Sequence, residues 1–229
     1  DIAEKKWSVA KADPESKIEF AKTRKLRVYL VPMSAMPAGE ILFSLPTISD
    51  DIGEAEGSSA PDDAVFAIHE DDWRQVEFVS QANDNQVLLE FDDIRRVYDG
   101  RKQSGGFATC HIRKRIPSPL MGADISLADL EERLNPSRKY RAVGIQRSIG
   151  TFKASFAWQI DETLVVWGVT DEQGLVRNLC LSGKASGPGA GATSAALAQL
   201  CADRGLSLID WCRTAKYSTK EDVVDSILK

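Results

Sequence analysis

The amino-acid sequence predicts an α+β protein with mixed or antiparallel sheets and two subdomains. The first observation is a series of short segments rich in β-branched and aromatic residues, separated by Gly, Pro, Asn and Asp. The second is a C-terminal half in which four such segments follow one another and are succeeded by a helix, a strand and a helix. The expected units are residues 1–118, a linker with a short helix over residues 119–139, and residues 140–229.

The N-terminal half contains five strand candidates, one loop and one helix. The strands are expected at residues 25–31, 40–45, 64–69, 73–80 and 106–116. Residues 46–63 carry acidic residues, Gly, Ser and Pro without an apolar period, which predicts a long loop. Apolar residues at helical spacing over residues 87–100 favour a helix that ends at Gly100. The alternative is a strand over residues 86–91 followed by a short helix.

The linker and the C-terminal half have clearer boundaries. Pro117 and Pro119 end the preceding strand, and Ser126 is placed to cap a short helix over residues 126–134. Turn residues separate the four strand candidates of the C-terminal half, which predicts an antiparallel meander. These strands are expected at residues 140–148, 151–160, 163–170 and 175–182, followed by a helix at 193–204, a strand at 206–211 and a helix at 218–228.

Composition limits the possible classes of protein. The four cysteines form no C-x-x-C pair and the chain has two histidines, so we expect buried free thiols and no metal site. Free thiols favour a reducing compartment, and a cytoplasmic location is the expectation, although the missing initiating Met leaves open whether a leader was removed. No apolar run approaches the ~20 residues of a membrane-spanning helix, so no membrane association is expected.

Charge is segregated along the first half of the chain. Residues 47–93 hold fourteen carboxylates against one basic residue, and residues 94–118 carry a local charge of +6. An acidic stretch that contains aromatic residues repels nucleic acid and favours a basic protein partner. The predicted contact residues are Asp62, Asp63, Glu70, Asp71, Asp72 and Trp73. The alternative is that the acidic residues only keep the chain in solution, while residues 94–118 neutralise them within the fold.

The segment "KASGPGAGATSAAL", residues 184–197, supports a second hypothesis. A strand, a glycine loop and a helix N-terminus occur in the order that can bind a phosphate. Lys184, Gly187 and Gly189 resemble the Q/R-x-x-G-x-G/A loop of the GNAT acyltransferases, which implies a site for acyl-CoA or a nucleotide at Lys184, Gly187, Gly189 and Gly191. Lys184 replaces the Gln or Arg of that family, and Pro188 removes one amide. A connector that needs glycine for its turns is the competing interpretation.

Candidate catalytic residues are few. Only His69 and His111 could serve a nucleophile as a base, and His111 and its neighbour Cys110 face opposite sides of a strand. A nuclease motif that begins at Pro61-Asp62 would need a lysine, and none occurs between Lys25 and Lys102. The sequence therefore favours a non-enzymatic interaction protein of the inhibitor or immunity type, with no cofactor. A structural subunit is a third possibility, and the oligomeric state is left open.

Overall fold

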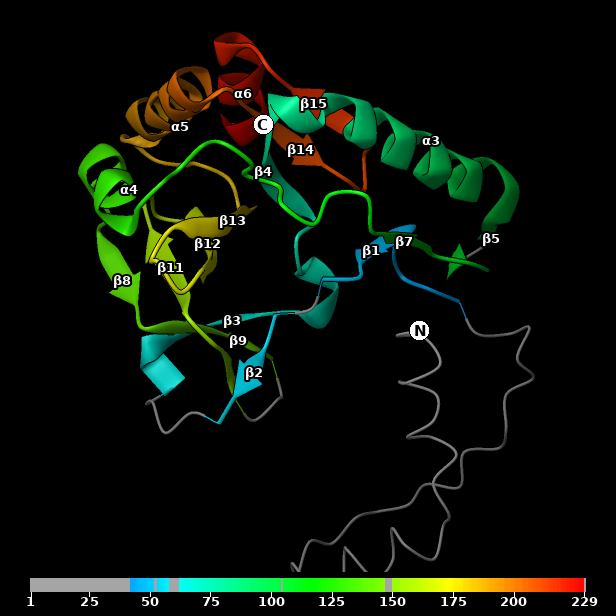
Figure 1. Cartoon of the computed structure of the whole chain (residues 1–229), viewed down its shortest axis with the longest axis horizontal. Helices are drawn as coiled ribbons and strands as arrows, with labels where there is room; N and C mark the ends of the chain where they lie inside the picture. The colour runs from blue at the N-terminus through cyan, green and yellow to red at the C-terminus, as the bar shows by residue number, and fades with distance from the viewer. Residues whose placement is uncertain (1–41, 52, 58–61, 104, 147–149, 229) are drawn as a thin grey trace, which may run out of the picture. The chain divides into compact units, whose positions relative to one another are not determined.

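The computed structural model describes residues 42–51, 53–57, 62–103, 105–146 and 150–228, which belong to one compact unit (Figure 1). The strands are β1 Thr47–Ser49, β2 Ala55–Glu56, β3 Val65–Ile68, β4 Val76–Ser80, β5 Lys102–Gln103, β6 Gly106–Phe107, β7 His111–Arg113, β8 Arg138–Tyr140, β9 Ala142–Ile145, β10 Thr151–Phe152, β11 Ser155–Gln159, β12 Val165–Thr170, β13 Val176–Ser182, β14 Leu206–Asp210 and β15 Ala215–Tyr217. The helices are α3 Asp84–Arg101, α4 Leu127–Leu134, α5 Ala190–Arg204 and α6 Lys220–Leu228, and single 3-10 turns are η2 Asp62–Ala64, η3 Glu70–Asp72 and η4 Gln81–Asn83. The α+β class predicted from the sequence is confirmed.

The largest sheet has seven antiparallel strands in the order β15-β14-β4-β13-β12-β11-β8. Three of them, β11, β12 and β13, belong to the meander predicted for the C-terminal half, and β8 supplies a fourth antiparallel strand. The first strand of the predicted meander, at residues 140–148, was wrong as part of this sheet, because its residues 142–145 form β9, which pairs with β3 and β10 instead. Between β8 and β11 the chain leaves this sheet and adds β9 and β10 to a separate four-stranded sheet, in which β3 runs parallel to β9.

Strand β4 lies between β13 and β14, although it comes from the first half of the sequence. It pairs with β14 from Leu206↔Ser80 to Asp210↔Val76 and meets β13 at Cys180↔Glu77. The sheet thus contains strands from both of the expected subdomains. The subdomain boundaries at residues 118 and 140 remain a prediction. If residues 1–118 and 140–229 folded separately, each would lack the pairing of β4 with β13 and β14.

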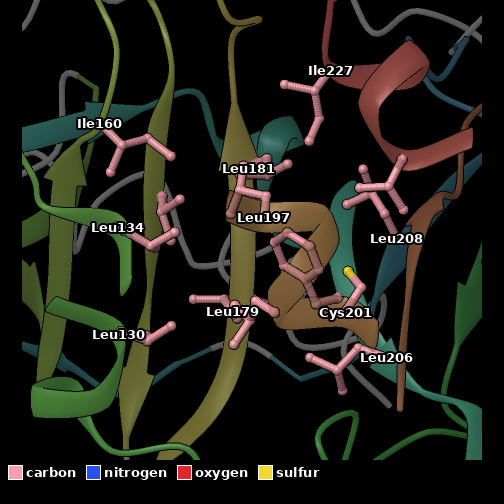
Figure 2. Packing of buried hydrophobic residues seen from close by; sticks show 14 of the residues in the cluster. Leu130, Leu134, Ile160, Leu179, Leu181, Leu197, Cys201, Leu206, Leu208 and Ile227 are labelled. Atoms are coloured by element: carbon pink, nitrogen blue, oxygen red, sulfur yellow. The ribbon is translucent and has the colours of Figure 1, made fainter. Parts of the chain in front are cut away.

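One face of the seven-stranded sheet is covered by α4, α5 and α6 (Figure 1). Figure 2 shows Leu197 and Cys201 of α5 among Leu179, Leu206 and other apolar side chains of the sheet. These side chains are buried, and burial of one leucine contributes roughly 1.5–3 kcal/mol. Helix α4 begins as predicted, because the Ser126 hydroxyl accepts the amide of Asp129 at 3.1 Å.

The opposite face of the sheet is covered in two places. Val143 and Phe152 of the four-stranded sheet, together with Trp73 from the segment before β4, pack against Trp167. Helix α3 packs Val87, Phe91 and Ile94 against Val79, Ile209 and Trp211. Both the helical prediction for residues 87–100 and the predicted strand at residues 64–69 agree with the structure, and the alternative strand over residues 86–91 was wrong.

Several predicted boundaries were wrong for local reasons. The loop expected over residues 46–63 contains β1 and β2, because their backbones pair with β7 and β10 despite a polar sequence. The strand expected at residues 106–116 is split into β6 and β7. The strand expected at residues 151–160 turns at Ala154, whose φ is 52°, so that Phe152 and Phe156 enter different hydrophobic clusters. The strand predicted at residues 25–31 lies outside the described residues. Of the strand predicted at residues 40–45, the described part, residues 42–45, forms only an isolated bridge between Phe43 and Phe107, so that prediction was wrong there.

None of the helices within the described ranges is both long and apolar enough to span a membrane.

Candidate protein-binding surface

The acidic residues singled out in the sequence lie at the two ends of β3. Asp62 and Asp63 belong to η2 before the strand, and Glu70, Asp71 and Asp72 form η3 after it. The side chains of Asp63, Glu70 and Asp72 are exposed, that of Asp71 is partly buried, and that of Asp62 lies outside the described part. The carboxylates at 70–72 therefore come from a single turn, which we call the acidic turn.

The acidic turn has defined local hydrogen bonds. His69 is its N-cap, and its Nδ1 accepts the amide of Asp71 at 3.2 Å. The hydroxyl of Ser44 donates to Oδ2 of Asp71 at 2.6 Å. These contacts use His69 and Asp71 within the fold and leave Glu70 and Asp72 directed to solvent.

Trp73, predicted as an aromatic anchor for a partner, has a different position. Its side chain is in the core, 6% exposed, with its ring centroid 4.2 Å from that of Phe152 and 5.3 Å from that of Trp167. Its indole N–H donates to the carbonyl of Asp51 at 2.5 Å. A partner cannot reach this indole, because packing against Phe152 and Trp167 buries it, so Trp73 is removed from the contact set. It fixes the end of the acidic turn instead.

Arg74, the residue after Trp73, also holds the C-terminal end of the acidic turn in place. Its residue exposure is 3%, its φ is 53°, and its guanidinium pairs with Glu77 at 2.8 Å and with Asp51 at 3.0 Å. Burial alone would lower the pKa of Arg74, but the charge of Glu77 and the hydrogen bond to it outweigh burial and raise the pKa above its usual value. The left-handed backbone conformation costs about 1–2 kcal/mol for a residue with a side chain. These ion pairs hold Arg74 in this conformation.

A second buried cation, Arg113 of β7, lies beside this ion pair. Its guanidinium donates to Thr47 Oγ1 at 3.1 Å, to Gln75 Oε1 at 3.3 Å and to the carbonyl of Arg74 at 2.7 Å. It also lies 4.9 Å from the ring centroid of Trp211, and burial lowers its pKa to about 10. This contact with the carbonyl of Arg74 connects the acidic turn to β7 and, through Trp211, to the core beneath α3.

A narrow cavity opens between these groups. Arg74, Glu77, Glu90 and Arg113 line it together with Trp211, whose indole N–H donates to Glu77 Oε1 at 2.8 Å. Glu77 and Glu90 are each 1% exposed. Both carboxylates and both guanidinium groups have their hydrogen-bond partners within the protein, so we interpret the cluster as the support of the acidic turn.

Three basic residues of the segment 94–118 pair with carboxylates of α3 rather than with the acidic turn. Arg95 pairs with Asp92, Arg96 with Asp93, and Arg115 with both Glu90 and Asp93. Among the residues that the structure describes, Asp63, Glu70 and Asp72 form no ion pair with a lysine or arginine. Neutralisation within the fold thus applies to the helix and not to these three exposed carboxylates.

The glycine loop has contacts that weigh against an anion site. The carboxylate of Asp161 accepts the amide of Ser186 at 2.8 Å, and a Cβ on Gly187 would lie 3.1–3.3 Å from the carboxyl group of Glu162. The amides of Ala190 and Ala192 donate to carbonyls of the same loop, those of Gly187 and Gly189. Lys184, Gly189 and Gly191 are exposed, and a Cβ on Gly189 would lie 3.9 Å from Asp161 Oδ2. A phosphate would meet negative charge here, and the connector interpretation fits the loop better.

The two histidines and the four thiols do not form an activated nucleophile in the described residues. His111 Nε2 donates to Glu90 Oε2 at 2.5 Å, and His69 caps the acidic turn. Burial raises the pKa of Cys110 and of Cys212 to about 11 and that of Cys201 to about 12, and it raises that of Cys180 well above its usual value. These thiols are protonated at neutral pH.

Sequence reasoning missed the residues that support the acidic turn. Arg74, Glu77, Glu90 and Arg113 appeared only in charge counts, since charged residues are rarely buried and no spacing marks those that are. The alternation of β4 offered one usable signal, because it places Glu77 on the same face as the apolar Val79. Comparison of the chain with protein-family models, with curated proteins and with solved structures gives no significant match.

Proposed function

We propose that this chain is a non-enzymatic interaction protein that binds a basic protein partner through the acidic turn and Asp63. The observation that carries the proposal is the contrast between two sets of carboxylates. Glu90, Asp92 and Asp93 on α3 are paired with arginines, whereas the carboxylates of Asp63, Glu70 and Asp72 are exposed and form no ion pair with a lysine or arginine among the described residues. Arg138 lies beside Asp63, but its guanidinium donates to the backbone carbonyl of Asp63 at 2.6 Å.

The support beneath the turn favours the same function. Trp73 and Arg74 hold the turn through an indole hydrogen bond, a buried ion pair with Glu77 and a partly exposed ion pair with Asp51. A rigid turn loses little conformational entropy when a partner binds, so more of the electrostatic attraction contributes to affinity. An inhibitor or immunity-type protein that blocks a basic surface of another protein would use such a turn.

The test is a set of charge reversals with a matched control. The test variant carries Asp63→Lys, Glu70→Lys and Asp72→Lys, and the control carries Glu132→Lys, Glu172→Lys and Glu221→Lys, which are exposed on other elements. The two variants have the same net charge, so nonspecific electrostatics change equally. Partners captured from native lysate by the unchanged chain are identified, purified and then measured against all three proteins by surface plasmon resonance.

We expect the test variant to lose about 10- to 1,000-fold in association rate at low salt, and the control to keep the rate of the unchanged chain within a small factor. Added salt should weaken binding of the unchanged chain, because exposed charges are screened. Equal binding by the test and control variants would refute the proposed surface.

A further inference from the structure

A second cluster of ionisable side chains lies on α3 and β7, and it shares Glu90 with the cavity described above. Glu90, Asp93 and His111 bring one carboxylate oxygen each and one imidazole nitrogen within 4.8 Å of one another. Glu90 is buried, and the side chains of Asp93 and His111 are 15% and 19% exposed. An ion could therefore enter from the surface beside Asp93 and His111 and contact the buried carboxylate of Glu90.

The Glu90 carboxylate is oriented independently of any cation. Its Oε1 accepts the backbone amides of Lys114 at 3.0 Å and Arg115 at 2.8 Å. Its Oε2 is therefore directed at His111 Nε2, 2.5 Å away, and at Arg115 Nη1, 2.8 Å away. Backbone hydrogen bonds of this kind orient carboxylates that coordinate metal ions.

A cation already lies between the two carboxylates. The Arg115 guanidinium bridges Glu90 Oε2 at 2.8 Å and Asp93 Oδ2 at 2.6 Å, while Asp93 Oδ1 pairs with Arg96 at 2.7 Å. The Arg115 side chain is 38% exposed, so its guanidinium can move into solvent while its backbone amide continues to hold Glu90. The buried Arg74 and Arg113 have no such freedom.

We infer that Glu90, Asp93 and His111 form a site for a divalent transition-metal ion of the Zn²⁺ class, and that this ion and the Arg115 guanidinium compete for it. One imidazole and two carboxylates suit Zn²⁺ and its neighbours better than Mg²⁺ or Ca²⁺, which prefer oxygen ligands alone. Three protein ligands leave a coordination position for water.

The required movements are small. Zn²⁺ binds nitrogen and oxygen at about 2.0–2.2 Å, so two ligands of a tetrahedral site lie roughly 3.4 Å apart. The His111–Glu90 distance must lengthen from 2.5 Å, and Asp93 must approach from within 4.8 Å. His111 Nε2 must also give up its hydrogen, either to solvent or by a change of tautomer, before its lone pair can bind the ion.

The test titrates Zn²⁺ into the full chain by calorimetry, with matched variants. We expect one ion per chain, about tenfold or greater loss of affinity in Asp93→Asn and His111→Gln, and tighter binding in Arg115→Gln because the competing cation is removed. Asp92→Asn and Arg95→Gln, on the exposed side of the same helix, are the controls and should bind like the unchanged chain. Circular dichroism confirms that each variant is folded.

Imidazole NMR distinguishes this site from any other. The chain has two histidines, so Zn²⁺ should shift the ring signals of His111 and leave those of His69 in place. Co²⁺ should give a spectrum without thiolate charge transfer, which separates the site from a cysteine site at nearby Cys110. The inference is overturned if His111 signals do not respond, if Asp93→Asn binds as tightly as the unchanged chain, or if Arg115→Gln does not strengthen binding.

Discussion

Substitution of Glu90 by Gln tests a buried carboxylate that has four hydrogen-bond partners. The buried Glu90 carboxylate accepts two backbone amides, the imidazole of His111 and the guanidinium of Arg115. Glutamine keeps an oxygen for the amides of residues 114 and 115, but its NH₂ group replaces the oxygen that accepts from His111 and Arg115. The variant therefore removes the ionic half of the cluster and changes the volume little.

The size of the effect follows from the pKa of Glu90. Burial alone would raise this pKa, but the hydrogen bonds from His111 and from the amides of Arg115 and Lys114 outweigh burial and lower it from 4.5 to about 2. One unit of pKa corresponds to about 1.4 kcal/mol, so ionised Glu90 contributes on the order of 3 kcal/mol to the free energy of unfolding. Because the folded-state pKa is the lower one, this contribution is complete above pH 4.5 and is lost as the pH falls through 2.

The assay is urea unfolding of both proteins at a series of pH values with a chelator present. At pH 7 we expect Glu90→Gln to be less stable by about 2–4 kcal/mol, because a buried ion-pair partner is removed. The difference between the two proteins should narrow steadily from pH 4.5 to pH 2. If the unchanged chain and the variant lose stability in parallel over this interval, Glu90 does not have the lowered pKa assigned to it and the argument fails.

Three further predictions test other parts of the fold. The four thiols should not react with a disulfide reagent at pH 8 in the native state and should all react after unfolding, because their raised pKa values leave little thiolate; rapid reaction of any thiol in the native protein would contradict this. Gly183→Ala would bring a Cβ into a steric clash with the carbonyl oxygen of Thr163 and should lower the free energy of unfolding by about 3 kcal/mol or more, measured by thermal unfolding. The control Gly174→Ala has a similar φ and no atom within 4 Å of the new Cβ, so it should lower the free energy of unfolding by only about 1–2 kcal/mol. Residues 119–229 expressed alone lack β4 and should show no cooperative unfolding, while residues 42–229 should; cooperative unfolding of the shorter fragment would support the subdomain boundary predicted from the sequence.

The C-terminal half was the most predictable part of the fold because its elements are specified locally. Ser126 caps α4, Gly205 ends α5, and turn residues separate β12 from β13, so short windows of sequence were sufficient. The insertion of β4 between β13 and β14 was not predictable in this way. Strand order depends on pairing between residues more than a hundred positions apart, and no local pattern encodes it.

The acidic residues of the candidate surface were found from the sequence, and the residues that support them were not. Charge segregation identified Asp63, Glu70 and Asp72, because exposed charges are visible in any count. Burial depends on the assembled fold, so Trp73 was taken for a surface anchor and Arg74 for a lone basic residue in an acidic segment. In the structure both residues are buried, and both support the acidic turn from inside the fold.

This support helps to separate binding from solubility as the reason for the acidic turn. Carboxylates that only keep a protein in solution can occupy any exposed loop and need no fixed geometry. Here the turn is followed by Arg74 in a left-handed conformation that costs about 1–2 kcal/mol, and two buried guanidinium groups, those of Arg74 and Arg113, carry a desolvation cost of several kcal/mol each before their partners offset it. A surface that needed only negative charge would require neither the left-handed Arg74 nor the two buried guanidinium groups. A surface that must present Glu70 and Asp72 at fixed positions to a partner gives a physical reason to retain them.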